Sequence, residues 1–484
     1  MNYPRFIIKP FVWLVVCLST MTAPALAAVD PHWSPIDVNG DGQPEVVAQT
    51  NLMDVAFNAR GEILGWYLKT QKGTDYKGKY SGKPNLVAAR SSIITGAGLK
   101  PGKTATPETS VEPGEGSTKT LVATFAYDAG GHAVSRTYRI ASSRYTVNVS
   151  TRVDGVNAYK LEFTGLGMAK PDLKLLQQGV TAPLTGAGSV NALGYASFQG
   201  GGSAIIIRPV AGGVPIAAST KTVQVPVANG QAQDKAAITL TLPGNQESNI
   251  QVYGGQNELV RLDLEHLASE PGLFQPNILG TLSLALIRLM QFLRQITGSW
   301  GLAIILLTVI IRSLIWPLMQ VQMKSTAEMQ ALQPKIAEIN KKFKDSTEKK
   351  SQATMALYKE HNVNPGAGCF PLIVQFPILI VMWRVIANYE FDQGFLWLHD
   401  LSLPDPFYIL VVLYVGVNIA QTYLATQGNK DMFRQQLIMQ VAFLFFVLTF
   451  PSGVTLYWVL STVIAVAQQW VINRQIKAKT LAAA

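Results

Sequence analysis

The chain has 484 residues, of which 48% are hydrophobic and only 14% are charged, and its formal net charge is +10. The low share of charged residues, together with a positive mean hydropathy, supports an integral membrane protein with a soluble part. The positive charge is spread over several loops, which argues against a nucleic-acid surface and favours a role in membrane orientation.

Residues 1–28 fit an export signal. Arg5 and Lys9 precede a short apolar stretch at residues 11–18, and Ala25 and Ala27 form a small-residue cleavage pattern. A retained first transmembrane helix is the alternative, but the stretch is short against the roughly 20 residues that a span needs. We expect cleavage. Because Cys17 would be lost, only Cys369 would then remain, which excludes an internal disulfide in the exported part.

Residues 29–260 show the period-two alternation of β-strands. The clearest strands are predicted at residues 120–127, 134–140 and 145–153, with turns between them. Further strands are predicted at residues 204–210, 223–227, 237–242 and 250–253. The pattern predicts an exported antiparallel β-sandwich domain.

One loop in this region resembles a metal site. Asp37, Asn39 and Asp41, followed by Gly42, copy the first half of a calcium loop, but Ala48 stands at position twelve, where a bidentate Glu is needed. The missing ligand favours an Asn/Asp/Gly-rich turn, so we expect no metal. Nothing else in the sequence predicts a cofactor.

Residues 261–297 are predicted to form a linker and an amphipathic helix. The apolar face comprises Leu279, Leu282, Leu286, Leu289 and Leu293. Arg288, Gln291 and Gln295 fall on the opposite side. Such a helix is expected to lie flat on the outer membrane surface. A buried helix packed on the sandwich is the alternative.

Arg312 is the most informative residue, because it lies inside an apolar run at residues 300–319 that is long enough to span a bilayer. Trp300 and Lys324 each lie twelve residues away. At a rise of about 1.5 Å per residue, the guanidinium is therefore roughly 18 Å from either edge. This depth costs an arginine at least ~2.5 kcal/mol. The later apolar runs contain no Asp, Glu or His: residues 369–387, 407–425, 437–450 and 454–471. We infer a water-filled cavity within the bilayer.

These runs predict a polytopic α-helical membrane protein with a five-span core at residues 298–476. The core includes a cytoplasmic helical hairpin at residues 322–364, and a short basic cytoplasmic tail follows at residues 477–484. The hairpin has a thin apolar face, so a mobile receptor for an arriving chain and a solvated connector both fit.

The distribution of Lys and Arg fixes the predicted orientation. Residues 324–364 contain eight lysines and are expected to be cytoplasmic, whereas residues 388–406 contain four acids without Lys or Arg and are expected to face outward. Lys430 and Arg434 mark the next inner loop, and Arg474 begins a cytoplasmic C-terminus.

Five motifs in the membrane half resemble the bacterial YidC membrane protein insertases. They are Asn-Pro-Gly-Ala-Gly-Cys-Phe-Pro-Leu-Ile-Val-Gln-Phe-Pro-Ile at 364–378, Leu-Gln-Pro-Lys at 332–335, Met-Ala-Leu-Tyr-Lys at 355–359, Trp-Leu-His-Asp-Leu at 397–401 and Phe-Pro-Ser-Gly-Val-Thr-Leu-Tyr at 450–457. The resemblance covers residues 279–475. It implies an insertase and chaperone of the bacterial inner membrane, not an enzyme, that moves nascent transmembrane segments into the bilayer, alone or with a secretion channel.

The resemblance also implies roles for particular residues. Arg312 would lie at the centre of a hydrophilic groove that opens to the cytoplasm and to lipid, and Thr308 and Gln375 would line it. The hydrophobic slide along which a new span leaves would comprise Phe376, Pro377, Phe446, Tyr457 and Trp458. Ordinary helix packing is the alternative for each aromatic residue. The implied partners are nascent membrane proteins, lipid, a secretion channel and the translating ribosome, without direct nucleic-acid recognition.

Three other classes of function are alternatives to an insertase. A proton-coupled transporter needs a titratable side chain in its spans, and the later apolar runs contain no Asp, Glu or His. An intramembrane protease needs a nucleophile–base pair, two aspartates or a zinc motif, but His361 and His399 fall in loops. An anchored sandwich that binds envelope ligands is the third class, and deletion of residues 40–250 would test it.

Two departures from the family pattern bear on the site. The short tail after Arg474 argues against strong ribosome docking through it. The loop between the third and fourth runs, residues 428–434, lacks the usual family pattern, and an approach of its Asp431 to Arg312 from the cytoplasmic side would weaken the inference of an unpaired cation.

Overall fold

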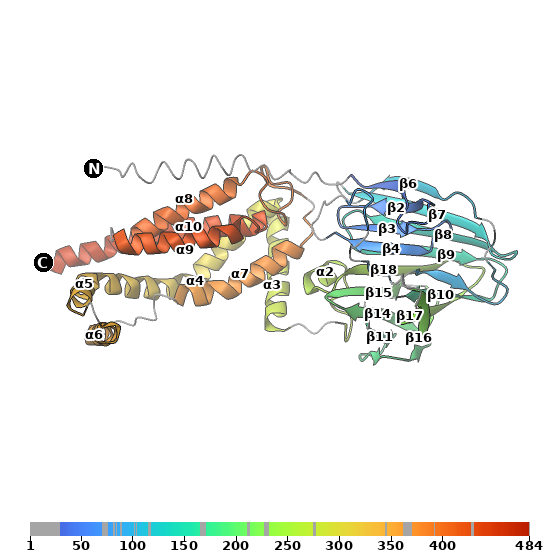
Figure 1. Cartoon of the computed structure of the whole chain (residues 1–484), viewed down its shortest axis with the longest axis horizontal. Helices are drawn as coiled ribbons and strands as arrows, with labels where there is room; N and C mark the ends of the chain where they lie inside the picture. The colour runs from blue at the N-terminus through green and yellow to red at the C-terminus, as the bar shows by residue number, and fades with distance from the viewer. Residues whose placement is uncertain are drawn as a thin grey trace. The chain divides into compact units, whose positions relative to one another are not determined.

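The computed structural model describes residues 30–69, 76–80, 83, 85–87, 90–100, 102, 104–114, 118–164, 171–210, 213–226, 232–273, 277–343, 346–361, 370–391, 393–426 and 430–483. The chain divides into two compact units, a β-sheet unit that ends before Asn277 and a helical unit from Asn277 to Ala484 (Figure 1). The predicted signal at residues 1–28 lies outside the described residues.

The β-sheet unit is built from antiparallel strands in three sheets. The described strands are β1 (His32–Ile36), β2 (Glu45–Gln49), β3 (Met53–Phe57), β4 (Ile63–Leu68), β5 (Ile93–Thr95), β6 (Glu108–Pro113), β7 (Lys119–Asp128), β8 (Ala133–Ala141), β9 (Thr146–Val153), β10 (Ala158–Thr164), β11 (Asp172–Gln177), β12 (Leu184–Thr185), β13 (Ser189–Val190), β14 (Leu193–Gly200), β15 (Ser203–Pro209), β16 (Ala217–Pro226), β17 (Ala232–Pro243) and β18 (Ser248–Gln256). The strand orders are β1-β2-β3-β4, then β13-β16-β17-β10-β5, then β12-β11-β14-β15-β18-β9-β8-β7-β6.

The core of this unit lies between the nine-stranded sheet and the two smaller sheets. Strand β8 alternates buried and accessible side chains, so one face of its sheet turns inward. Phe57 of β3, Tyr138 of β8 and Leu240 of β17 belong to one buried cluster. The predicted strands therefore coincide with β7, β8, β9, β15, β16, β17 and β18, and the antiparallel fold is confirmed.

The β7–β8 hairpin shows how the sequence sets the register. Gly130 and Gly131 adopt positive φ, which side chains disfavour, and the Asp128 carboxylate accepts the Gly131 N–H at 3.0 Å. The turn lies at the position that the sequence predicts, and it pairs Tyr127 with Val134.

Two helices follow the strands, α2 (Leu259–Leu264) and α3 (Ile278–Thr297). Helix α3 begins where Asn277 accepts the Gly280 N–H at 2.8 Å, and it ends at Gly298, which has a left-handed φ of 70°.

The packed face of α3 differs from the prediction. Gly280, Ser283, Ile287, Met290 and Leu293 are its buried residues, and the helix packs on α4 and α7. Leu293 alone of the predicted leucine face is fully buried, and Leu282 is 49% exposed. The apolar pattern could not distinguish helix contacts from a surface that faces lipid, because both select leucine.

The remaining helices are α4 (Trp300–Ala331), α5 (Gln333–Lys342), α6 (Thr347–Glu360), α7 (Phe370–Asn388), α8 (Ile409–Thr426), α9 (Lys430–Val447) and α10 (Ser452–Ala483). The five predicted apolar runs fall in α4, α7, α8, α9 and α10. Among the described residues, Trp300–Gln320 and Ser452–Val471 are long and apolar enough to cross a membrane, and Gln375–Asn388 and Ile409–Leu424 are shorter apolar helices.

The predicted hairpin is formed by α5 and α6. Leu332 and Leu357 are its buried residues, with Ile336, Ile339 and Tyr358 packed around them. Ser346 caps α6 by accepting the Lys349 N–H at 3.4 Å. The apolar contact is small, as the sequence predicts.

Candidate functional site

Arg312 lies in the second half of the apolar part of α4 and is half-buried. Its Nε is buried and has no hydrogen-bond partner among the described residues. The ion pairs of the described part of the chain do not include Arg312. A guanidinium in such surroundings needs polar neighbours or water, since an unpaired buried charge is costly.

Polar side chains on two other helices lie near this cation. Tyr457 of α10 is close enough to act on the Arg312 charge electrostatically, and it is only 1% exposed. The Gln375 amide of α7 donates a hydrogen bond to the Tyr457 hydroxyl at 3.2 Å. The structure therefore brings Arg312, Gln375 and Tyr457 together from α4, α7 and α10.

Thr308 lies one turn before Arg312 and is fully buried. Its hydroxyl donates to the Ile304 carbonyl of the same helix at 2.7 Å. A threonine in a helix often satisfies its hydroxyl in this way. In this conformation Thr308 therefore contributes packing, and its proton is not directed at a substrate.

The residues predicted to form the slide fall into two groups. Phe376 and Phe446 are 54% and 62% exposed, and Pro377 is exposed beside Phe376. Trp458 instead packs in an aromatic cluster, with ring centroids 5.1 Å from Phe443 and 5.7 Å from Phe450. Exposed aromatic side chains on an apolar helix are suited to contact lipid or an apolar segment, whereas the Trp458 cluster holds helices together.

The family described as "60Kd inner membrane protein" matches residues 292–479. The membrane protein insertase YidC of Deinococcus radiodurans is 41% identical over 411 residues, which cover 82% of this chain and 93% of that protein. The chain belongs to the YidC family of membrane protein insertases.

Further relatives agree with this assignment. The YidC insertase of a Shewanella species is 30% identical over 72% of this chain and 70% of its own length. A crystal structure described as an active YidC insertase with the first transmembrane domain resolved aligns with a TM-score of 0.54 at 21% identity, covering 96% of this chain and 98% of that one. This protein is thus a multi-pass inner-membrane insertase rather than an enzyme, and nascent membrane proteins are its substrates.

The sequence does not predict a polar pair between α8 and α9. The Gln440 amide of α9 donates to the Thr422 hydroxyl of α8 at 2.6 Å. Ser461 of α10 is fully buried, and its hydroxyl has no partner among the described residues. Neutral polar residues are common in membrane helices, so a single sequence gives no signal that separates them from ordinary helix contacts. The side chain of Asp431 lies outside what the structure describes.

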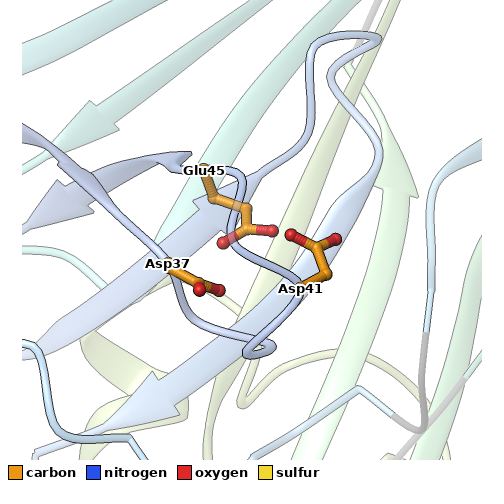
Figure 2. Close-up of side chains that lie close together, drawn as sticks. All are labelled: Asp37, Asp41 and Glu45. Carbon is orange, nitrogen blue, oxygen red and sulfur yellow. The ribbon is translucent and has the colours of Figure 1, made fainter.

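The acidic loop of the β-sheet unit is the remaining cluster of chemical interest. Figure 2 shows the Asp37, Asp41 and Glu45 carboxylates converging between β1 and β2, within 4.8 Å of one another. The calcium-loop pattern does not point to Glu45, because it requires the bidentate Glu at position twelve, where Ala48 stands. Burial raises the Glu45 pKa, and Asp41 adds to the effect. Asp37 accepts the Gly40 and Gly42 N–H groups, and Glu45 accepts the Val38 N–H. These bonds hold the chain in the turn that the sequence predicts at residues 37–42.

Proposed function

We propose that Arg312 is the cation of a hydrated groove through which this insertase receives the polar leading segment of a nascent membrane protein. The single observation that carries the proposal is the Arg312 Nε, which is buried in an apolar helix without a partner among the described residues. Placing an arginine at such a depth costs at least ~2.5 kcal/mol. Hydration in a groove between α4, α7 and α10 offsets this cost.

The groove lowers the barrier for the arriving chain. Each unpaired backbone group costs several kcal/mol in hydrocarbon, so a polar segment cannot enter a bilayer alone. Water around Arg312 and the polar groups of Gln375 and Tyr457 supply hydrogen-bond partners partway across. The positive charge also attracts acidic side chains of the leading segment.

The apolar part of the substrate would leave sideways. Phe376, Pro377 and Phe446 present exposed apolar surface on α7 and α9. A new span that contacts these side chains exchanges one apolar surface for another and then enters lipid. We assign the slide to these residues, with Tyr457 and Trp458 fixing the helices behind them.

The charge pattern supports an orientation for this activity. The lysine-rich hairpin and the C-terminus would face the cytoplasm, where the ribosome and the nascent chain arrive, and the β-sheet unit would lie on the periplasmic side. A secretion channel and the translating ribosome are the partners proposed for the two sides of this route.

The test uses an Arg312→Ala variant in cells depleted of the native insertase. Insertion of a substrate with an acidic leading segment should fall about tenfold, the factor that roughly 1.4 kcal/mol of lost attraction gives. Arg312→Lys keeps the charge and should retain much of the activity.

A matched substrate provides the control. When the acidic side chains of the leading segment are replaced by their amides, Arg312→Ala and the parent should differ much less. Equal insertion of the acidic substrate by Arg312→Ala and the parent would refute the proposal.

A further inference from the structure

The described part of the connector between α7 and α8, residues 389–391 and 393–408, is tightly folded. Phe395 and Leu398 exchange both backbone hydrogen bonds, at 2.8 and 2.9 Å, which closes a sharp turn. Leu398 and Leu401 are at most 2% exposed. These contacts give the connector a fixed shape of its own.

The connector packs on the start of α4. The Phe395 ring lies so close to Gly301 that a Cβ added there would come within 2.0 Å of a ring carbon. Glycine is therefore required in the first turn of α4, because any side chain would displace the ring. This contact fixes the beginning of the helix that carries Arg312.

The connector also caps the start of α10. The Ser452 N–H donates to the Leu403 carbonyl at 2.6 Å, and the Gly453 N–H donates to the Leu401 carbonyl at 2.9 Å. First-turn N–H groups have no partner within their own helix, so these carbonyls supply bonds that α10 needs. Tyr457 lies five residues beyond Ser452 on the same helix.

The Asp405 carboxylate joins two parts of the connector to each other and to α8. This side chain is 4% exposed, and its carboxylate accepts three N–H groups: Trp397 Nε1 at 3.1 Å, the Phe407 backbone at 3.0 Å and the Leu410 backbone at 2.7 Å. Leu410 lies in the first turn of α8, where the helix dipole favours a negative charge. One carboxylate thus joins the Trp397 turn to α8.

We propose that Asp405 is a positioning residue of this insertase. Its carboxylate holds the connector as a clamp across the first turns of α4, α8 and α10. The clamp sets the relative register of α4 and α10, and with it the approach of Tyr457 to Arg312. This role deepens the proposed function of the Arg312 groove, on which it rests.

The test combines insertion assays with hydrogen–deuterium exchange of the full-length insertase in nanodiscs. Asp405→Ala should reduce insertion and should also speed exchange at the Ser452 and Gly453 amides by about tenfold, the size expected when a hydrogen bond to a buried charged group is lost. Trp397→Phe removes the donor of one of the three hydrogen bonds to Asp405. It should also reduce insertion and speed exchange at Ser452 and Gly453, but by less than Asp405→Ala does. His399→Ala changes an exposed side chain of the same connector and should change neither.

The remote amides separate a clamp from a local cap. If Asp405→Ala speeds exchange at Phe407 and Leu410 but leaves Ser452 and Gly453 at the parent rate, Asp405 only caps α8 and the proposal fails, whatever happens to insertion. Parent-like insertion despite faster exchange at Ser452 and Gly453 would also overturn it. Asp405→Asn keeps an oxygen for Trp397 and Phe407, and it should fall between Asp405→Ala and the parent. All these variants retain Arg312, so failure of the groove proposal would appear separately, as normal insertion by Arg312→Ala.

Discussion

Two buried cations of the β-sheet unit are stabilised in different ways. Lys69 and Asp54 form an ion pair at 2.7 Å, and their side chains are at most 1% exposed. Arg136 is fully buried and instead donates to the carbonyls of Gly61 and Ser92, at 2.8 and 2.6 Å. Carbonyl oxygens carry no formal charge, and the ion pairs of the described residues do not include Arg136. Its Nε and Nη2 are also buried without a hydrogen-bond partner among those residues. Arg312 likewise has no ion pair among the described residues, and it lies in an apolar helix.

The Lys69–Asp54 pair yields a stability prediction. Lys69→Met leaves the Asp54 carboxylate buried with Tyr80 as its remaining side-chain donor, and this change should lower the free energy of unfolding by about 3–5 kcal/mol. The double variant Lys69→Met with Asp54→Asn removes both charges and should recover much of the loss. Urea unfolding of the full-length protein in detergent, followed by near-ultraviolet circular dichroism, measures both.

The pH dependence of this variant has a defined sign. Burial already raises the pKa of Asp54, against the opposing effect of Lys69, and removal of Lys69 should raise it further. A carboxyl group whose pKa is higher in the folded state than in the unfolded state stabilises the fold most at a pH below its unfolded-state pKa. This contribution is lost as the pH rises toward the folded-state pKa. Lys69→Met should therefore be more damaging at neutral pH than in acid. A loss of equal size in the double variant would contradict this account.

At the scale of elements, α7 and α9 present the surface that the slide requires. Phe376 and Phe446 are exposed, whereas Tyr457 and Thr308 are buried. A photo-reactive side chain at 376 or 446 should crosslink to the apolar segment of a stalled nascent chain. The same group at 457 should crosslink much less, because the Tyr457 side chain is only 1% exposed. Crosslinks of equal yield at all the positions would show that exposure does not define the path.

Helix positions were easier to predict than helix faces. The apolar runs located α4, α7, α8, α9 and α10, since length and hydropathy are local properties of the sequence. The face that each helix buries depends on its neighbours. The sequence therefore predicts Leu282 and Leu286 on the apolar face of α3, whereas Ile287 and Met290 are the residues that pack. The family resemblance implies that Trp458 belongs to the slide, but its ring packs in an aromatic cluster for the same reason.

At the scale of the whole molecule, the sequence predicts a β-strand part followed by a helical part, and it singles out Arg312. Arg312 was recognisable because a single charge in an apolar run has few structural explanations. Gln375 was found only through the family resemblance, and its bond to Tyr457 could not be foreseen, because it joins residues that are 82 positions apart. The sequence shows Asp405 only as an acidic residue of a loop, since the three N–H groups that it accepts come together only in the folded chain.

Hydration at position 312 is the most direct test of the central claim. Arg312→Cys, in a background where Cys17 and Cys369 are serine, would be exposed to a charged, membrane-impermeant thiol reagent from the cytoplasmic side. Leu314→Cys is the matched control, because Leu314 is 76% exposed but apolar and lies on the other side of α4. A hydrated groove predicts rapid labelling at 312 and none at 314, since thiols react with such reagents as thiolates in water. If 312 is as unreactive as 314, the cation does not lie in water and the proposed groove is wrong.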